Sequence, residues 1–150
     1  MPPVTLTPTK LAALGRKPSP KRDPMREPPI KRRSILVVDD DPAVRRLLER
    51  ILVLEGYIVR MARNGKEGSD AFISYGADLV ISDMHMPEMN GLEMLKEIRG
   101  ASPNAKVIIL SGGATDEDRD AMEAAGAFCV MRKPVEFEKL VAALGDALSG

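Results

Sequence analysis

The amino-acid sequence predicts an α/β protein with a five-stranded parallel sheet and helices on both of its faces. From residue 34 onward, five short apolar runs alternate with five segments in which apolar residues recur at helical spacing. The runs are apolar throughout rather than at every second residue, which is typical of strands buried on both faces of a parallel sheet. Crossovers between such strands are right-handed and place helices on both faces.

The first half of the domain begins with a strand over residues 35–38, followed by a helix. Asp41 is the expected N-cap of that helix and Pro42 its first residue, where the N–H that proline lacks would have no partner in any case. Gly56 ends the helix. Residues 57–62 form the second strand, and the turn at Asn64-Gly65 leads into a second helix over residues 66–74.

The second half repeats this pattern. Residues 79–82 form the third strand, and a loop over residues 84–90 leads into a helix over residues 92–99. The fourth strand covers residues 107–110. Thr115 is the expected N-cap of a helix over residues 116–125, which Gly126 closes. The predicted fifth strand and last helix cover residues 128–131 and 136–148.

Residues 1–33 differ in composition from the rest of the chain. They hold eight of the twelve prolines, and nine Lys and Arg against two Asp and Glu. Residues 34–150 hold thirteen Lys and Arg against twenty Asp and Glu. A segment so poor in large apolar groups cannot offset the entropy of ordering. We therefore expect residues 1–33 to be a disordered, basic, proline-rich extension and residues 34–150 to be the folded domain.

The compartment can also be inferred from the sequence. No apolar run approaches the roughly 20 residues of a membrane span, and no apolar signal-peptide region follows Met1. The single cysteine, Cys129, has no partner for an internal disulfide. These features favour a cytoplasmic protein without a membrane span.

Polar side chains follow four of the five predicted strands: Asp39 and Asp40, Asp83, Ser111 and Lys133. Sites in open parallel sheets lie beyond the carboxyl ends of the strands, so these groups should meet at one rim. A single aspartate after a strand is commonly a helix N-cap. Capping does not explain three acids, because Asp41 is better placed for it than its neighbours and Asp83 precedes a loop.

This set of groups predicts a phosphorylation site. Clustered carboxylates repel one another unless a cation is present, and Mg²⁺ accepts carboxylate ligands while keeping room for a phosphoryl oxygen. A carboxylate beside the ion can attack phosphorus and become an acyl phosphate. Lys133 and Ser111 can then contact the phosphoryl oxygens.

Four segments, Ile35–Pro42, Ile81–Gly91, Val107–Ala114 and Gly126–Pro134, resemble the signature segments of response-regulator receiver domains, the phosphoacceptor domains of two-component signal transduction. The resemblance covers residues 34 to about 148, with all four segments in the family's order and spacing. It implies the flavodoxin-like strand order 2-1-3-4-5.

The resemblance also implies a role for each group at the rim. Asp83 corresponds to the phosphoacceptor and Asp40 to a direct Mg²⁺ ligand. Asp39 would hold the ion through water, and His85 would offer its backbone carbonyl. Ser111 corresponds to the switch hydroxyl. Lys133 corresponds to the lysine that precedes a cis proline, here Pro134.

The sequence departs from the family in the expected switch. The family usually has Tyr or Phe three residues before the lysine, a place that Val130 takes here. The ring that swings inward when the switch hydroxyl moves is therefore absent. Phe128, two residues earlier and on the same face of the strand, is a candidate substitute.

The function implied is that of a stand-alone response regulator. A sensor histidine kinase or a His phosphotransfer protein would phosphorylate Asp83, and phosphorylation would switch binding to a downstream protein target. The domain would not be an enzyme, although it would assist its own phosphorylation and dephosphorylation. No DNA-binding domain is expected, because the chain ends two residues after Leu148.

Two alternatives stay open at this stage. Residues 39–43 superficially match the Asp-x-Asp opening of haloacid-dehalogenase-type phosphatases, whose nucleophile would be Asp39. That family, however, wants Thr or Val at Ala43 and an acidic pair after the lysine. The other alternative, a receiver fragment of a hybrid kinase, is disfavoured because the sequence starts at Met1.

Overall fold

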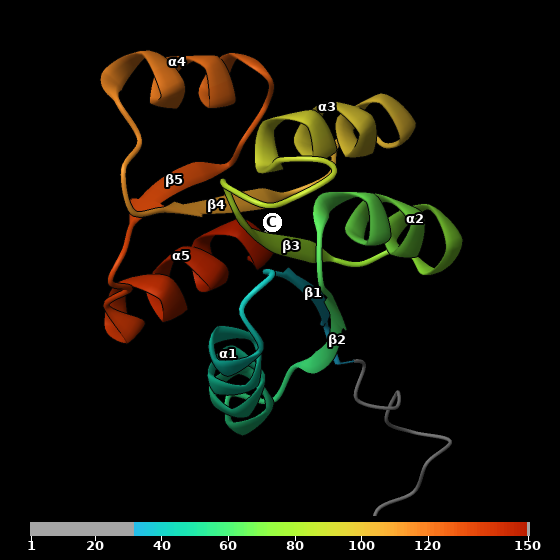
Figure 1. The fold of residues 1–150 in the computed structure, drawn as a ribbon. Helices are drawn as coiled ribbons and strands as arrows, with labels where there is room; N and C mark the ends of the chain where they lie inside the picture. Colours follow the sequence, from blue (N-terminus) through green and yellow to red (C-terminus); the bar gives the residue numbers. More distant parts are fainter. Residues whose placement is uncertain (1–31, 150) are drawn as a thin grey trace, which may run out of the picture. The chain divides into compact units, whose positions relative to one another are not determined.

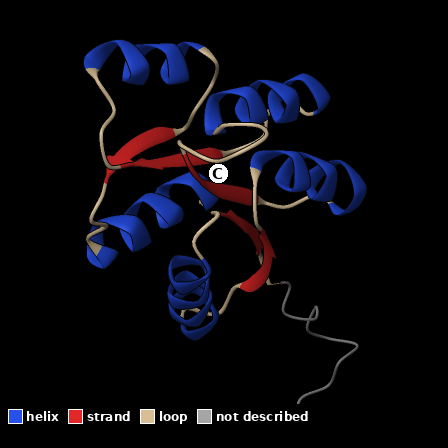
Figure 2. Cartoon of the chain, in the orientation of Figure 1, coloured by secondary structure: helices blue, strands red, loops and turns tan. Residues whose placement is uncertain are grey.

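The structure, a computed structural model, describes residues 32–149 (Figures 1 and 2). The predicted disordered extension lies outside the described residues, except for Arg32 and Arg33. Its disorder, and a domain boundary at residue 34, therefore stay predictions.

Strands and helices alternate along the described residues, as predicted. The strands are β1 (Ser34–Val38), β2 (Ile58–Ala62), β3 (Leu79–Asp83), β4 (Val107–Ser111) and β5 (Cys129–Arg132). The helices are α1 (Pro42–Leu54), α2 (Gly65–Tyr75), α3 (Gly91–Ala101), α4 (Asp116–Ala124) and α5 (Phe137–Leu148). All strand pairs are parallel, and the order β2-β1-β3-β4-β5 confirms the predicted topology.

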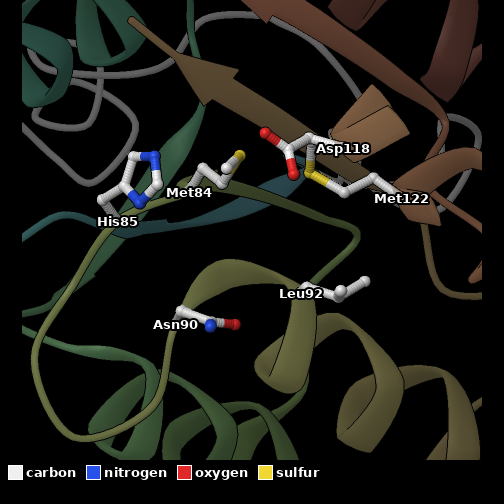
Figure 3. A pocket seen from close by; sticks show the side chains of 6 residues that line it. All are labelled: Met84, His85, Asn90, Leu92, Asp118 and Met122. Carbon is white, nitrogen blue, oxygen red and sulfur yellow. The ribbon is translucent and has the colours of Figure 1, made fainter. Parts of the chain in front are cut away.

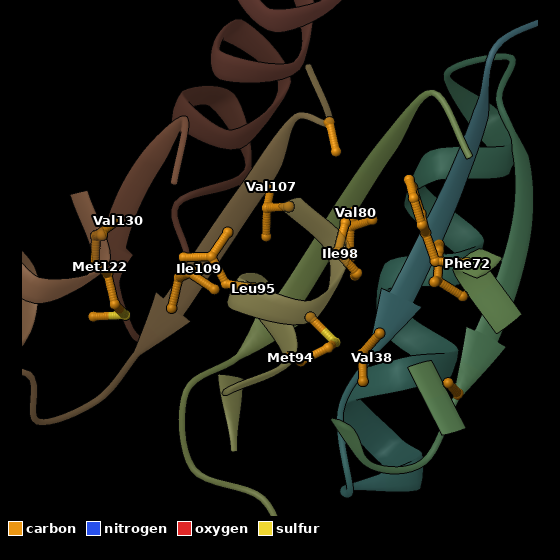
Figure 4. Packing of buried hydrophobic residues seen from close by; sticks show 13 residues of the cluster. Val38, Phe72, Val80, Met94, Leu95, Ile98, Val107, Ile109, Met122 and Val130 are labelled. Atoms are coloured by element: carbon orange, nitrogen blue, oxygen red, sulfur yellow. The ribbon is translucent and has the colours of Figure 1, made fainter. Parts of the chain in front are cut away.

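Two apolar layers hold the helices against the sheet. Leu48 and Leu52 of α1 and Leu140 and Leu144 of α5 are buried on one face. On the other face, side chains of α2, α3 and α4 pack against β1, β3, β4 and β5 (Figure 4). Figure 1 shows the same division, with α1 and α5 on one side of the sheet and the other three helices across it. Burial on both faces accounts for the continuous apolar runs in the strands.

Side-chain capping explains where α1, α2, α3 and α4 begin. The carboxylate of Asp41 accepts a hydrogen bond of 2.9 Å from the N–H of Ala43, so Asp41 is the cap that the sequence predicted. Thr115 caps α4 in a reciprocal capping box with Asp118. The other helix ends lie within two residues of their predicted positions.

The register of the sheet determines which residues meet at its carboxyl edge. Val38 pairs with Ser82, so the residues that follow them, Asp39 and Asp83, are neighbours. Ser111 pairs with Arg132, so Lys133 lies just beyond the fourth strand's last residue. None of the helices in the described part of the chain is long and apolar enough to cross a membrane.

Candidate functional site

Three carboxylates meet at the carboxyl edge of the sheet, as the sequence predicted. Each of Asp39, Asp40 and Asp83 has an oxygen within 4.8 Å of the oxygens of the other two. Asp39 is only 2% exposed and Asp83 8%, whereas Asp40 is exposed to solvent. Hard oxygen ligands at this spacing, with one side open, suit a divalent cation that keeps part of its water shell.

Asp39 is held by its backbone and by both of its carboxylate oxygens. Its N–H donates to the carbonyl of Ala62 at 3.2 Å. One carboxylate oxygen, Oδ1, accepts a hydrogen bond of 2.9 Å from the N–H of Asp41, and Oδ2 lies 3.4 Å from Nζ of Lys133. The side chain of Asp39 is therefore already engaged on both oxygens.

Asp83 is the last residue of β3, and its surroundings fix its backbone closely. A Cβ atom on Gly91 would lie 2.5 Å from the carbonyl oxygen of Asp83, so only glycine lets α3 begin this close to the strand end. The Oδ1 atom of Asp83 accepts a hydrogen bond of 2.9 Å from the N–H of Met84. The same oxygen lies 3.2 Å from Nζ of Lys133.

Lys133 places its ammonium group between the two buried acids. Its own N–H donates to the carbonyl of Ser111 at 2.8 Å, which ties the residue to the end of β4. The Lys133-Pro134 peptide bond is cis, as the resemblance implied. Burial by itself would lower the pKa of Lys133, but the charges and hydrogen bonds of Asp39 and Asp83 raise it above its ordinary value. The group is therefore a cation at neutral pH.

The electrostatics of the acids also favour a bound cation. Burial raises the pKa of Asp39, against the opposing effects of the Asp41 N–H and of Lys133, and the charge of Asp83 raises it further. The ionised form of Asp39 is thus held at a cost, because its carboxylate is buried and shares one ammonium group with the carboxylate of Asp83. A divalent cation among these oxygens would remove that cost, so the residues present fit such an ion.

Ser111 lies beside this cluster, at the end of β4. It is 2% exposed, and its hydroxyl oxygen accepts a hydrogen bond of 3.3 Å from the N–H of Gly113. Gly112 and Gly113 are both exposed in the loop that follows. A small hydroxyl next to a loop of two glycines can turn toward a new acceptor without displacing a packed side chain.

His85 lies on the loop after β3, two residues beyond Asp83. The residue is exposed, and its side chain faces a hollow between this loop and α4 (Figure 3). The residues lining the hollow are Met84, His85, Asn90, Leu92, Asp118 and Met122. The imidazole is thus outside the carboxylate cluster, and the role that the resemblance implies concerns only the backbone carbonyl.

Sequence reasoning missed Arg45 of α1. The Nη1 atom of this half-buried side chain donates a hydrogen bond of 2.6 Å to the carbonyl oxygen of Asp39. The available signal was position: Arg45 lies in the first turns of a helix that starts immediately after the acids. Residues there can turn back toward the strand end, but only the packed structure shows which of them does so.

The geometry disfavours the phosphatase alternative. That hypothesis makes Asp39 the nucleophile, yet Asp39 is the more deeply buried acid and both of its oxygens are engaged. Asp83 is the more accessible of the two buried acids. The relatives described next support neither the phosphatase nor the hybrid-kinase alternative.

The sequence is similar to known bacterial regulators. It is 40% identical over 114 residues to the transcriptional regulatory protein GlrR of Escherichia coli, a match that covers 76% of this chain and 26% of GlrR. It is 38% identical over 108 residues to the response regulator MprA of Mycolicibacterium vanbaalenii, covering 72% of this chain and 47% of MprA. The chain thus matches less than half the length of either relative.

Solved structures of response regulators are also similar to this chain. A response regulator receiver domain protein from Clostridium thermocellum superposes with a TM-score of 0.75 at 33% identity, covering 78% of this chain and 94% of that one. A DNA-binding response regulator of the LuxR family from Staphylococcus aureus superposes with a TM-score of 0.72 at 25% identity, covering 77% and 98%.

These relatives overturn one expectation. We expected no part for a DNA-binding domain. That expectation is wrong: GlrR is a transcriptional regulatory protein, and the Staphylococcus aureus relative is a DNA-binding response regulator. The physical reason is that each domain buries its own core, so the sequence of one folding unit carries no sign of another.

The family itself follows from the sequence and the geometry together. Residues 35–145 match the response regulator receiver domain family. The strand order, the three acids and the lysine beyond β5 are those that the resemblance to the family implied. This chain therefore belongs to the response regulator receiver domain family of two-component signal transduction.

Proposed function

We propose that Asp83 accepts a phosphoryl group from a phosphohistidine carried by a sensor histidine kinase or a His phosphotransfer protein. The observation that carries this proposal is the position of the Asp83 carboxylate. It is 3.2 Å from Nζ of Lys133, close to two further acids, and less deeply buried than Asp39. A carboxylate in such surroundings can act as a nucleophile toward phosphorus.

The reaction moves one phosphoryl group. A carboxylate oxygen of Asp83 supplies the electron pair for a new O–P bond, while the N–P bond of the phosphohistidine breaks. The departing imidazole nitrogen keeps the bonding pair and takes up a proton from solvent. The product is an acyl phosphate on Asp83 and a free histidine on the donor.

The acids supply a site for Mg²⁺. Asp40 and Asp83 would bind the ion directly, together with the backbone carbonyl of His85, and Asp39 would hold it through a water molecule. When bound, the ion neutralises charge on the transferring phosphoryl group. The clustering of the carboxylate oxygens and the raised pKa of Asp39 support this assignment.

Lys133 and Ser111 act on the phosphoryl oxygens. The ammonium of Lys133, which bridges Asp39 and Asp83 here, would turn to the phosphoryl group and offset its charge. The hydroxyl of Ser111 would donate to another phosphoryl oxygen and give up its contact with Gly113. In this proposal the domain is a cytoplasmic phosphoacceptor that assists its own phosphorylation and dephosphorylation rather than an enzyme with a separate substrate.

Chemical phosphorylation tests the assignment. With Mg²⁺ and acetyl phosphate, the protein should gain one acid-stable, base-labile phosphoryl group, seen in the intact mass. Asp83→Asn should abolish it, because an amide is a poor nucleophile. Asp70→Asn is the matched control, since Asp70 is an exposed acid on α2 paired with Lys66. Unchanged labelling of Asp83→Asn, or loss of label only in Asp39→Asn, would refute the assignment.

A further inference from the structure

One charged contact at the acid cluster has no part in the proposed phosphoryl transfer. Arg45 reaches back from α1, and its Nη1 atom donates to the carbonyl oxygen of Asp39 at 2.6 Å. The backbone N–H of Arg45 donates to the carbonyl of Asp41 at 3.0 Å, as the helix requires. Arg45 therefore ties the loop between β1 and α1 to the helix from both its backbone and its side chain.

The Asp39 carbonyl is a consequential place for this hydrogen bond. It belongs to the peptide group that joins Asp39 to Asp40, and a peptide group is planar. A bond to its oxygen fixes how that plane is turned, and so limits the direction in which Asp40 leaves the backbone. Asp40 is exposed, so packing constrains its side chain less than it constrains those of Asp39 and Asp83. A charge-assisted hydrogen bond is among the stronger ones available for such a task.

The positive charge of Arg45, taken by itself, would weaken the binding of a cation at the acid cluster. A guanidinium beside the acid cluster would compete with a bound cation, so the loss of its charge alone would tighten metal binding. The charge of Arg45 also acts on Glu67, in the first turn of α2. Hydrogen bonds from Arg63 lower the pKa of Glu67 most, and the charges of Arg63 and Arg45 lower it further. Positioning and repulsion therefore predict opposite outcomes for the same substitution.

We propose that Arg45 is a positioning residue for the cation site: by holding the Asp39–Asp40 peptide group, it aims the Asp40 carboxylate at the ion. The proposal rests on the proposed function, because it assumes that the acid cluster binds Mg²⁺. Groups that orient metal ligands typically change metal affinity by about 10- to 100-fold when they are removed.

The test is a Mg²⁺ titration of the full chain by calorimetry, with Mn²⁺ paramagnetic resonance as an independent signal. Arg45→Met should weaken binding about tenfold. Arg45→Lys keeps the charge and one donor, and should recover part of the loss. Arg46→Met is the matched control. Its side chain is exposed on the outer face of α1, so it removes the same charge without touching Asp39. We expect that variant to bind Mg²⁺ with the wild-type affinity.

The outcomes separate the two proposals. If Arg45→Met binds Mg²⁺ as tightly as the wild type or more tightly, repulsion outweighs positioning and the inference fails. If the wild type itself binds no Mg²⁺, the proposed metal site fails and takes the inference with it. Should Arg45→Met not fold, Arg45→Lys decides: affinity below that of Arg46→Met supports positioning, and affinity equal to it overturns it.

Discussion

The acid site (Asp39, Asp40, Asp83, Ser111 and Lys133) and the α4–β5 region (α4, β5 and residues 112–114) follow the family pattern to different degrees. Every group of the acid site is the residue type that the family resemblance implies, and Asp39, Asp83 and Lys133 each have defined polar partners. In the α4–β5 region, Val130 occupies the place of the usual aromatic ring. Phosphoryl chemistry needs particular groups at particular positions, whereas a packed region can be filled in several ways.

The α4–β5 region is held by different contacts from those expected of an aromatic switch. Val130 is 7% exposed and belongs to the same apolar cluster as Met122 of α4 (Figure 4). Arg119 of α4 donates a hydrogen bond of 2.9 Å to the carbonyl oxygen of Val130. Phe128 cannot replace the missing ring. It is exposed and lies before β5, about 13 Å along the sheet from the level of Ser111.

The largest effect is expected from Lys133→Met in the acid site. Loss of the ammonium should slow labelling by acetyl phosphate about 100-fold or more, as when an enzyme loses one preorganised donor to a charged transition state. Rates of mass gain at saturating Mg²⁺ measure it. The control Lys139→Met removes an exposed lysine that pairs with Glu136. Equal labelling rates for the two variants would show that phosphorylation at the acid site does not depend on the Lys133 ammonium group.

The second prediction concerns packing in the α4–β5 region. Val130→Tyr should destabilise the domain by about 1–3 kcal/mol, because the added ring must enter a filled cluster. Urea unfolding followed by circular dichroism measures the change, with Phe128→Tyr as the exposed control. A tyrosine accommodated at no cost would mean that space for a switch ring has been kept.

The third prediction is a gain in stability at the acid site. Burial raises the pKa of Asp39, so its ionised form is unfavourable in the folded protein. Asp39→Asn should raise the free energy of unfolding of the metal-free protein by about 1 kcal/mol, within the usual range for one substitution. Asp41→Asn is the control, because asparagine caps a helix as well as aspartate does.

The pH dependence of that gain has a definite sign. A folded-state pKa above the unfolded value means that the folded protein binds more protons, so wild-type stability falls as pH rises through the window just above 3.8. The higher free energy of unfolding of Asp39→Asn, relative to the wild type, should therefore appear over that pH window and persist at neutral pH. Unfolding curves of both proteins on either side of it would show this. If Asp39→Asn were more stable than the wild type only at low pH, burial of the ionised Asp39 carboxylate would not be the cause.

The smallest expected effect is a change in the alkylation rate of Cys129, in β5, when the acid site is occupied. Burial raises the pKa of this thiol, opposed in part by the charge of Arg119, so alkylation at neutral pH should be slow. Because Val130 stands where the family has its switch ring, binding of Mg²⁺ with beryllofluoride should change the alkylation rate by less than about twofold. A much larger change would show that the α4–β5 region responds to the acid site without an aromatic residue.

Much of the fold and of the acid site could be predicted from the sequence. Continuous apolar runs indicated strands buried on both faces, and the carboxyl ends of parallel strands share one edge, so Asp39 and Asp83 were expected at the same edge of the sheet. The position of Phe128 was less predictable. The strand was expected over residues 128–131 but covers Cys129–Arg132, because pairing with β4 rather than local apolarity sets its ends.

By itself, the sequence determined the order of the elements, the caps at Asp41 and Thr115, and the residue types at the carboxyl edge of the sheet. These depend on local preferences and on a periodicity that a single chain displays. Only the tertiary structure decided that Lys133 bridges Asp39 and Asp83, that Arg45 holds the Asp39 carbonyl, and that Arg119 holds Val130. Long flexible side chains can reach many partners, and the partner is selected by packing and charge between elements distant in sequence.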